Sequence, residues 1–365
     1  MTTHVARAAV SDGKGGYRIE EIHVDSPGPG EVLVRIAASG LCHTDHKILA
    51  RDPAGVMGHE GAGTVVETGD GVTGIQADDR VVLNWAMPCR RCASCRRGLY
   101  NVCKNRPQVD ANRRRLRRES IGASFGLGTL ADYALVPAAA VVAIPRSLSL
   151  GWAPAATFGC CVMTGWGSVT NVARVPAGAS VAVIGAGAVG LCAIRAAAAA
   201  GAKTIVAIDV KSAKLELAQK FGATRVLLAD AADEGLVRAA ATVRAWCDDE
   251  GSDFAFECTS VPALGAAPLA MVRDGGMAVQ ISGIEEKVLI DMQLFEWDKV
   301  YVNPLYGGCD PQRDFPRLFA AHERHELKVD DLVTHIYPLE RLDEAMQEML
   351  SGRAGKVVLT MGAES

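Results

Sequence analysis

The sequence lacks two features that would suggest a large partner: a surplus of positive charge and a long apolar run. Lys and Arg total 38 against 42 Asp and Glu, a net charge of −4 over 365 residues. This balance favours neither nucleic acid nor an anionic membrane. No stretch of about 18 uncharged apolar residues predicts a membrane span, and residues 1–16 hold no run that fits a secretory signal. We therefore expect a cytoplasmic protein that binds small molecules.

The composition, with 49% hydrophobic and 22% charged residues, is that of a compact globular protein of about two domains. Short apolar runs between Gly-rich and Asp-rich turns predict a β-rich first third. From Ser180 onward the pattern changes to a strand, a glycine turn, a long Ala-rich helix and a second strand, which predicts a βαβ unit of a parallel sheet. The runs that we expect to form strands are 31–36, 61–69, 80–85, 180–185, 203–209, 254–258, 277–283 and 355–361.

Four of the 11 cysteines are spaced C-x2-C-x2-C-x7-C, a pattern that can wrap one loop around a tetrahedral zinc ion. Thiolate ligands fill all four positions, so this zinc would be structural. The four residues are Cys89, Cys92, Cys95 and Cys103.

A second, scattered set consists of Cys42 in GLCHTD, His59 and Glu60 in GHEGAG, and Cys160 in FGCCVMTGWG. Taken singly, each residue is as well explained by a structural role. Together, two thiolates and one imidazole leave the fourth zinc position open, as a catalytic site requires. Asp45 is the right type of residue to orient the ring of His59.

The motif GAGAVG follows an expected strand and opens an expected helix, the context in which backbone N–H groups face a pyrophosphate. Asp209 ends the next expected strand, 19 residues beyond Gly190. A carboxylate there can accept from both ribose hydroxyls and would repel a 2′-phosphate, which favours NAD over NADP. The alternative is that Asp209 only caps the following helix. The residues of the turn are Gly185, Gly187, Ala188, Val189 and Gly190.

These motifs resemble those of the zinc-dependent alcohol dehydrogenases of the medium-chain dehydrogenase/reductase family, in the family's order and along essentially the whole chain. The resemblance implies an α/β fold with a GroES-like β-rich catalytic domain, formed by residues 1–160 and 304–365, that carries a structural zinc lobe at 89–103. It also implies an inserted Rossmann domain, a doubly wound parallel sheet, at 161–303. We expect two zinc ions and one NAD per chain, and a homo-oligomer with a dimer favoured.

The resemblance also implies individual roles. Cys42, His59 and Cys160 would bind the catalytic zinc, and Glu60 would lie close behind it. The residues that would contact NAD are His43 and Lys356 at the pyrophosphate, Asp209 and Lys214 at the adenosine ribose, and Thr164 near the nicotinamide. Thr44 would carry the alcohol proton, and Lys47 or His46 would end the relay. Trp85 and Phe125 are candidate walls of the substrate cleft, or else core residues.

Two departures from the family concern substrate choice. Only 13 residues separate Asp45 from His59, which shortens a loop at the substrate mouth. The run RRRLRR, Arg113–Arg118, predicts a solvated loop, with contact to an anionic substrate as the second interpretation.

The predicted reaction is hydride transfer between a primary or secondary alcohol and NAD. One alternative is a thiol-dependent formaldehyde dehydrogenase acting on a hydroxymethyl adduct. Another is a dinucleotide-binding sensor without turnover, although a sensor needs neither an open metal position nor a hydroxyl relay.

Overall fold

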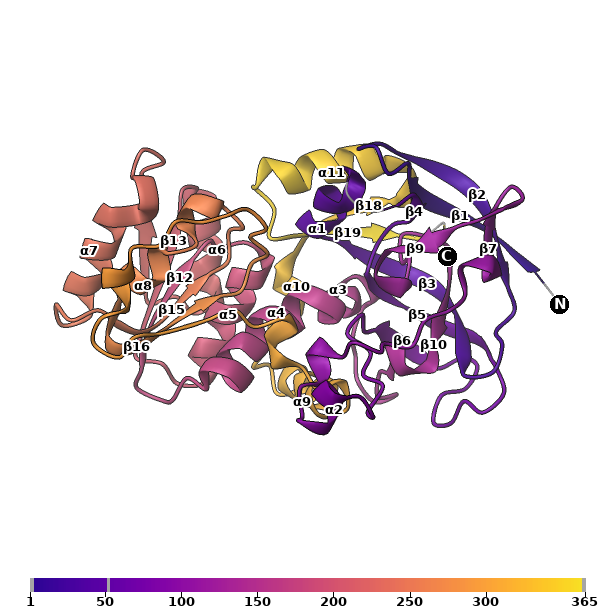
Figure 1. Cartoon of the computed structure of the whole chain (residues 1–365), viewed down its shortest axis with the longest axis horizontal. Helices are drawn as coiled ribbons and strands as arrows, with labels where there is room; N and C mark the ends of the chain where they lie inside the picture. Colours follow the sequence, from indigo (N-terminus) through magenta and orange to yellow (C-terminus); the bar gives the residue numbers. More distant parts are fainter. Residues whose placement is uncertain (1–2, 51–52, 363–365) are drawn as a thin grey trace. The chain divides into compact units, whose positions relative to one another are not determined.

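The computed structural model describes residues 3–50 and 53–362, and its contacts divide the chain into two compact units (Figure 1). The first unit runs up to Cys160 and resumes with Asp310–Glu323 and with the chain from Val329 onward. The second unit comprises Cys161–Cys309 and Arg324–Lys328. Segments from both ends of the sequence therefore build the first unit, which has most of the strands, and the middle of the sequence builds the second.

The first unit contains two sheets. In spatial order, one consists of β8 (Glu119–Ser120), β7 (Arg114–Leu116), β2 (Tyr17–Asp25), β1 (Thr3–Ser11), β4 (Gly55–Val56) and β9 (Gly122–Ala123). The other consists of β11 (Val141–Ala143), β6 (Arg80–Leu83), β5 (Glu60–Thr68), β3 (Glu31–Leu41), β19 (Lys356–Thr360) and β18 (Val333–Pro338), with β10 (Tyr133–Pro137) also paired to β3. The helices of this unit are α1 (His43–Lys47), α2 (Ala93–Arg96), α3 (Trp152–Thr157), α9 (Pro311–Glu323), α10 (Val329–Leu332) and α11 (Leu342–Ser351).

Strand β3 is central to the second of these sheets because it pairs antiparallel with β5, β10 and β19. The sequence predicts alternation between buried and exposed residues along it, but Val32, Leu33 and Val34 are all buried. Neighbouring elements cover both faces here, so the side chains on both faces are apolar. The pairing places the end of β3, the start of β5 and the start of β19 together, since Gly40 lies opposite Glu60 and Leu41 opposite Val357.

The second unit is a parallel sheet flanked by helices. Its strands, in spatial order, are β14 (Arg225–Leu228), β13 (Thr204–Asp209), β12 (Ser180–Ile184), β15 (Ser252–Glu257), β16 (Val272–Gln280) and β17 (Val300–Val302). Its helices are α4 (Met163–Gly167), α5 (Ala188–Ala199), α6 (Ser212–Phe221), α7 (Val237–Trp246) and α8 (Ala267–Met271). The strand order changes direction between β12 and β15, as in doubly wound dinucleotide-binding folds. The predicted α/β fold is confirmed.

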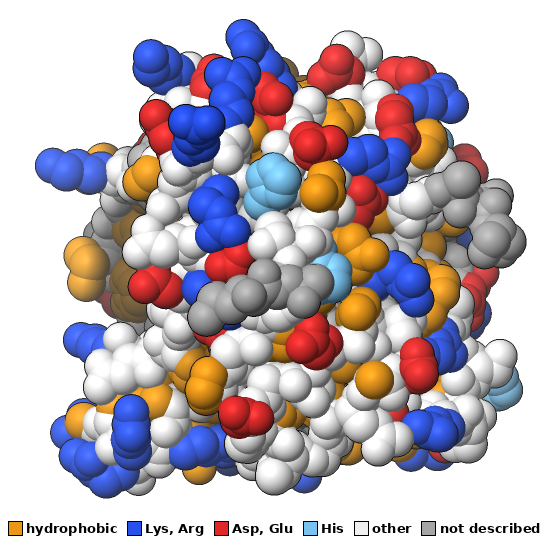
Figure 2. Space-filling view, turned by 90° about the vertical axis from the view of Figure 1, so that its right-hand side faces the viewer, with side chains coloured by type: hydrophobic (Ala, Val, Ile, Leu, Met, Phe, Trp, Pro, Cys, Tyr) orange, Lys and Arg blue, Asp and Glu red, His pale blue; other side chains and the backbone are white. Residues whose placement is uncertain are grey.

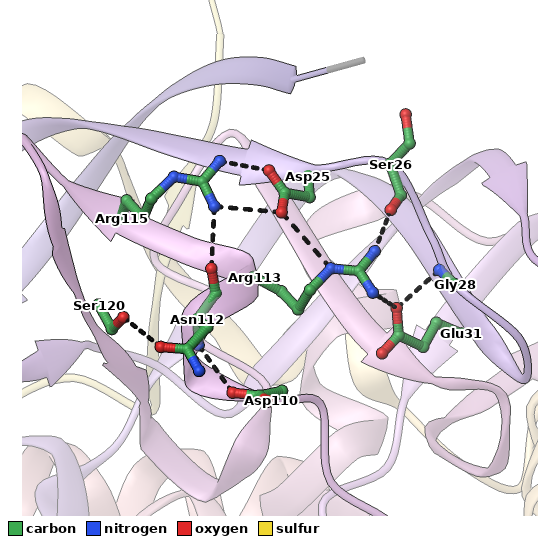
Figure 3. A network of polar contacts seen from close by, with 9 residues as sticks. All are labelled: Asp25, Ser26, Gly28, Glu31, Asp110, Asn112, Arg113, Arg115 and Ser120. Atoms are coloured by element: carbon green, nitrogen blue, oxygen red, sulfur yellow. Dashed lines mark hydrogen bonds and ion pairs between the residues drawn. The ribbon is translucent and has the colours of Figure 1, made fainter. Parts of the chain in front are cut away.

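The Arg113–Arg118 run is not a solvated loop, and that prediction was wrong. Residues Arg114–Leu116 form β7 and pair with β2, and the guanidinium of buried Arg114 donates to the carbonyl of Leu135. Figure 3 shows that Arg113 and Arg115 both contact Asp25. The first three arginines therefore make contacts that stabilise the first unit. Arg117 and Arg118 are the exposed members of the run.

The surface agrees with the small net charge. Acidic and basic side chains are interspersed over most of the face drawn in Figure 2. Among residues 3–50 and 53–362, no helix combines the length and the apolarity that crossing a bilayer requires.

Candidate metal and dinucleotide sites

The four cysteines of the close-spaced motif converge in the first unit. Their sulfur atoms all lie within 4.8 Å of one another, and the sulfurs of Cys92 and Cys103 are 3.8 Å apart. Zinc–sulfur bonds of about 2.3 Å in a tetrahedron place sulfurs about 3.8 Å apart, so the group fits zinc. The backbone N–H of Cys95 lowers the pKa of Cys92 to about 6, which favours the thiolate that a metal needs.

The scattered set also converges. Cys42 follows β3 and caps α1, His59 and Glu60 lie at the start of β5, and Cys160 follows α3. One donor atom from each of the four residues lies within 4.8 Å of the other three. Cys160 belongs to a π-helical turn, Phe158–Val162, which adds a residue to the helix and changes the direction of its side chains.

Glycines allow these ligands to approach one another. Gly58 has a φ of +92°, and a Cβ there would lie 2.5 Å from the backbone nitrogen of Leu130. A Cβ on Gly159 would lie 2.6 Å from the carbonyl oxygen of Leu83 in β6. Both contacts are with backbone, which cannot rotate away, so a side chain at either position would move the neighbouring ligand.

Asp45 orients His59 as the sequence suggests. Its Oδ1 lies 3.0 Å from His59 Nδ1, while its Oδ2 accepts the N–H of Cys42 at 2.9 Å. Both side chains are buried. A hydrogen bond at Nδ1 leaves Nε2 as the ligand atom, and Nε2 lies 4.0 Å from Glu60 Oε1. The carboxylate thus fixes the ring and one sulfur ligand together.

The pKa values of the two thiols of this set are shifted in opposite directions. The hydrogen bond from Cys160, aided by His59, holds the pKa of Cys42 well below its usual value. The same hydrogen bond and burial raise the pKa of Cys160. Burial also raises the pKa of Glu60 to about 7 despite the opposing effect of Lys356. Such a group of buried soft and acidic donors is typical of a transition-metal site.

The donor set fits zinc. Cys42, His59 and Cys160 would supply two sulfurs and one nitrogen, the chemistry of a catalytic zinc site. Within the described chain, the buried Oε2 of Glu60 has no hydrogen-bond partner, whereas its Oε1 accepts from Lys356 Nζ at 2.7 Å. A positive ion near the carboxylate would satisfy this oxygen.

Lys356 is a member of this group that sequence spacing could not reveal. Its ammonium is buried, with 4% of the side chain exposed, and its partner Glu60 lies 296 residues away in the sequence. The expected contact between Lys356 and a pyrophosphate stays a prediction.

Helix α1 carries the other predicted catalytic residues. The hydroxyl of Thr44 lies 3.6 Å from the sulfur of Cys42. His43 and His46 are exposed, and Lys47 is partly exposed. The helix therefore extends from the metal ligands to solvent.

Aromatic rings line one side of the metal ligands. The ring of Phe125 lies 4.6 Å from that of His59, and Trp85 meets Phe125 edge-on at 5.2 Å. Phe125 has a φ of +53°, a conformation that side chains with a Cβ adopt at some energetic cost. Trp85 is 6% exposed. The rings are thus fixed against the ligand group.

The glycine-rich turn of the second unit forms a cradle at the start of α5. Gly185 has a φ of +90°, and a Cβ on Gly190 would lie 1.9 Å from the carbonyl oxygen of Gly185. These two glycines allow the tight turn and the close packing of helix and strand. Gly187 caps α5, so the N–H groups of Ala188 and Val189 begin the helix and are available to an anion.

Asp209 and Lys214 flank this cradle. Asp209 ends β13, and its carboxylate accepts the N–H groups of Ala186 at 2.9 Å and Lys211 at 3.0 Å. Burial lowers the pKa of Lys214. A Cβ on Gly187 would lie 3.6 Å from Lys214 Nζ, so the ammonium faces the turn. Thr164 lies elsewhere in this unit, in α4, where its carbonyl accepts the hydroxyl of Ser168.

The comparisons with known proteins cover nearly the whole chain. Residues 28–146 match the alcohol dehydrogenase GroES-like domain, and residues 188–322 match the zinc-binding dehydrogenase domain. A putative alcohol dehydrogenase D of Mycobacterium tuberculosis is 34% identical over 92% of this chain and 94% of its own. A probable S-(hydroxymethyl)glutathione dehydrogenase of Schizosaccharomyces pombe is 32% identical over 98% of both chains. The crystal structure of benzyl alcohol dehydrogenase from Acinetobacter calcoaceticus superposes with a TM-score of 0.86 at 26% identity, over 99% of this chain and 100% of that chain.

Proposed function

Because the chain belongs to the zinc-dependent alcohol dehydrogenases of the medium-chain dehydrogenase/reductase family, we propose that it transfers a hydride between a primary or secondary alcohol and NAD. The observation that carries the proposal is the group of donors around Cys42, His59 and Cys160, which combines a catalytic ligand set with a fixed imidazole. Zinc bound there would supply Lewis acidity that lowers the pKa of an alcohol. NAD in the glycine-rich cradle would accept the hydride.

The residues of the first unit orient the reacting groups. Asp45 holds His59 with Nε2 toward the ligands, and the Lys356 ammonium holds Glu60 beside them. The hydroxyl of Thr44 lies 3.6 Å from the Cys42 sulfur, and it would take the proton from an alcohol bound at the ligand group. Lys47 or His46, on the same short helix, would end the relay.

The residues of the second unit bind the cofactor. The glycine turn would hold the pyrophosphate on its N–H groups, and Lys214 adds positive charge. Asp209 would accept from the adenosine ribose hydroxyls and disfavour a 2′-phosphate. His43, Thr164 and Lys356 are the further proposed NAD contacts.

The substrate that we propose is an alcohol with a flat apolar group. The rings of Trp85 and Phe125 lie fixed beside His59 and would form an apolar wall for such a group. A hydroxymethyl-thiol adduct is the second candidate, because a relative named for that substrate is 32% identical over 98% of the chain.

One assay separates the candidates. The purified protein is given NAD with aliphatic, benzylic and polyol substrates, and separately with formaldehyde plus glutathione, while absorbance at the NADH band is recorded. We expect benzylic alcohols to give the largest kcat/KM. Turnover only with formaldehyde plus glutathione would establish the second candidate, and no turnover with any substrate would contradict both.

Neighbouring cysteines provide a matched pair of variants. Cys160→Ala should abolish nearly all activity and remove about one zinc per chain, because it deletes a ligand. Cys161→Ala deletes a buried thiol outside the ligand group and should keep both zinc ions and most activity. Zinc content and turnover are measured together, and equal effects of the two substitutions would refute the ligand assignment.

A further inference from the structure

The carboxyl end of β15 holds a buried acidic residue that no role above requires. Glu257 is the last residue of β15 and is fully buried. Its strand pairs with β12, with Ile184 opposite Glu257, and the strand order changes direction between these two strands. In doubly wound sheets the cofactor binds outside the carboxyl ends of the strands at this switch point. Glu257 therefore ends the strand next to the one that leads into the glycine-rich turn, at the switch point where folds of this class form their cofactor crevice.

Three uncharged donors meet the Glu257 carboxylate. Oε1 accepts both the backbone N–H and the hydroxyl of Thr259, each at 2.5 Å, and Oε2 accepts the hydroxyl of Ser282. Burying a carboxylate is expensive unless hydrogen bonds replace its hydration, and these bonds do so. One side chain thus ties together the segments that follow β15 and β16.

The bonds fix the Thr259 turn in an unusual conformation. Thr259 Oγ1 accepts the N–H of Val261 at 3.0 Å while its proton goes to Glu257, which leaves the threonine one orientation. Ser260, between them, has a φ of +63°. A non-glycine residue in the left-handed region persists only where its surroundings impose it, and such residues cluster at ligand sites.

The oriented threonine packs against the glycine-rich turn. A Cβ on Gly185 would lie 2.7 Å from Thr259 Cγ2 and 3.3 Å from the carbonyl carbon of Cys258. Gly185 is the residue whose φ of +90° begins the turn. A shift of the Thr259 segment would therefore reach the backbone proposed to bind the pyrophosphate.

Ser282 is held from a second direction. Its carbonyl accepts Gln280 Nε2 at 2.8 Å, and its backbone N–H donates to the carbonyl of Glu257 at 3.3 Å. Both the main chain and the side chain of Glu257 thus set the start of the segment after β16.

We propose that Glu257 is a positioning residue for NAD: its carboxylate locks the Thr259–Val261 turn and Ser282 in the conformation that shapes the crevice opposite the glycine-rich turn. The inference rests on the proposed NAD site. It adds a residue that contacts the segments proposed to line that site and does not contact the cofactor itself. A neutral amide in its place has one acceptor oxygen and an NH2 that only donates, so the Ser282 hydroxyl must reverse and accept, and the Thr259 donors lose their charged acceptor.

The test compares two substitutions at opposite ends of the same strand in the full-length, zinc-loaded protein. Glu257→Gln should raise the Kd for NAD about tenfold, since a hydrogen bond to a charged group is lost in the wall of the site. The control is Asp253→Asn at the amino end of β15, where the carboxylate likewise accepts a backbone N–H and a hydroxyl, both from Ser180. It should lower the Tm and leave the Kd for NAD unchanged.

Three further checks distinguish a loss of positioning from general destabilisation of the protein. Thr259→Val deletes the hydroxyl and should weaken NAD binding as Glu257→Gln does, while Thr259→Ser keeps the hydroxyl and should restore most of the affinity. These variants test the same lock if Glu257→Gln fails to fold. Binding of adenosine, which has no phosphate for the glycine-rich turn and is proposed to use Asp209 at the end of β13, should stay within about twofold of the parent in all of them. In turnover, KM for NAD should rise while kcat stays close to that of the parent.

Each possible outcome decides either the inference or the proposed function. NAD binding of parental strength in Glu257→Gln or Thr259→Val overturns the inference, as does an equal loss of NAD and adenosine affinity, which would mark a structural role only. Failure of the parent to bind NAD overturns the proposed function, and the inference with it.

Discussion

Replacing Gly159 with alanine should displace one metal ligand and leave the rest of the fold in place. A Cβ there would lie 2.6 Å from the carbonyl oxygen of Leu83, 0.8 Å inside an ordinary contact of 3.4 Å. Leu83 cannot yield, because β6 is paired on both sides by β5 and β11. The π-helical turn must therefore move, and Cys160 moves with it.

The magnitude follows from the tolerance of the metal site. Overpacking of this kind costs about 1–3 kcal/mol in the free energy of unfolding, which would lower the Tm by several degrees. Zinc sites tolerate about 0.2 Å in a ligand distance, so a sulfur displaced by more than that no longer coordinates well. We expect Gly159→Ala to lose about one zinc per chain and at least about tenfold in kcat, while the four-cysteine group keeps its metal.

The assay measures zinc per chain, Tm and kcat for Gly159→Ala beside Gly151→Ala. The control glycine precedes α3 in the same segment, and its nearest neighbour is Pro154 Cδ at 3.4 Å, an ordinary contact. Gly151→Ala should therefore match the parent in zinc content and turnover. Full zinc content and parental kcat in Gly159→Ala would refute the argument that backbone packing positions Cys160.

Three further predictions concern the cofactor, the proton and the ion pairs. Asp209→Asn keeps an acceptor for the N–H of Ala186 but loses the negative charge, so the ratio of kcat/KM for NAD to that for NADP should fall by about tenfold. Thr44→Ala should lower kcat by about a hundredfold or more with an unchanged Kd for NAD, and Thr44→Ser should retain most of the activity. The hydrogen bond from Arg115 lowers the pKa of Asp25, so the folded state binds this proton more weakly and its stabilisation is present above about pH 4 and lost on acidification. Asp25→Asn should accordingly lower the Tm at pH 7 and reduce the fall in Tm between pH 5 and 3; an unchanged acid profile would contradict this.

The sequence predicted those parts of the site whose spacing is dictated by chemistry. Four thiolates around one zinc need a short loop, and the cysteines at 89–103 are close in the sequence for that reason. The glycine turn is equally local, because one strand, one turn and one helix make the cradle. Local rules were sufficient in each case.

Other features depend on distant partners and could not be predicted in this way. The run at Arg113–Arg118 looks like a solvated loop until Asp25, almost 90 residues earlier, is placed beside it (Figure 3). Similarly, the run 254–258 predicts only a strand. The positioning role proposed for Glu257 depends on Ser282, which the next strand of the sheet brings to it.

The Glu60–Lys356 pair shows why the end of the chain belongs to the candidate active site. The strands that carry them, β5 and β19, both pair with β3, so the sheet brings together charges separated by 296 residues. Burying two charges gains little stability, and removing one partner leaves the other uncompensated. Stability alone therefore gives no reason to place this pair there. Its position beside Cys42, His59 and Cys160 does give a reason, because Lys356 fixes the Glu60 carboxylate at the ligand group and opposes the rise in its pKa that burial causes.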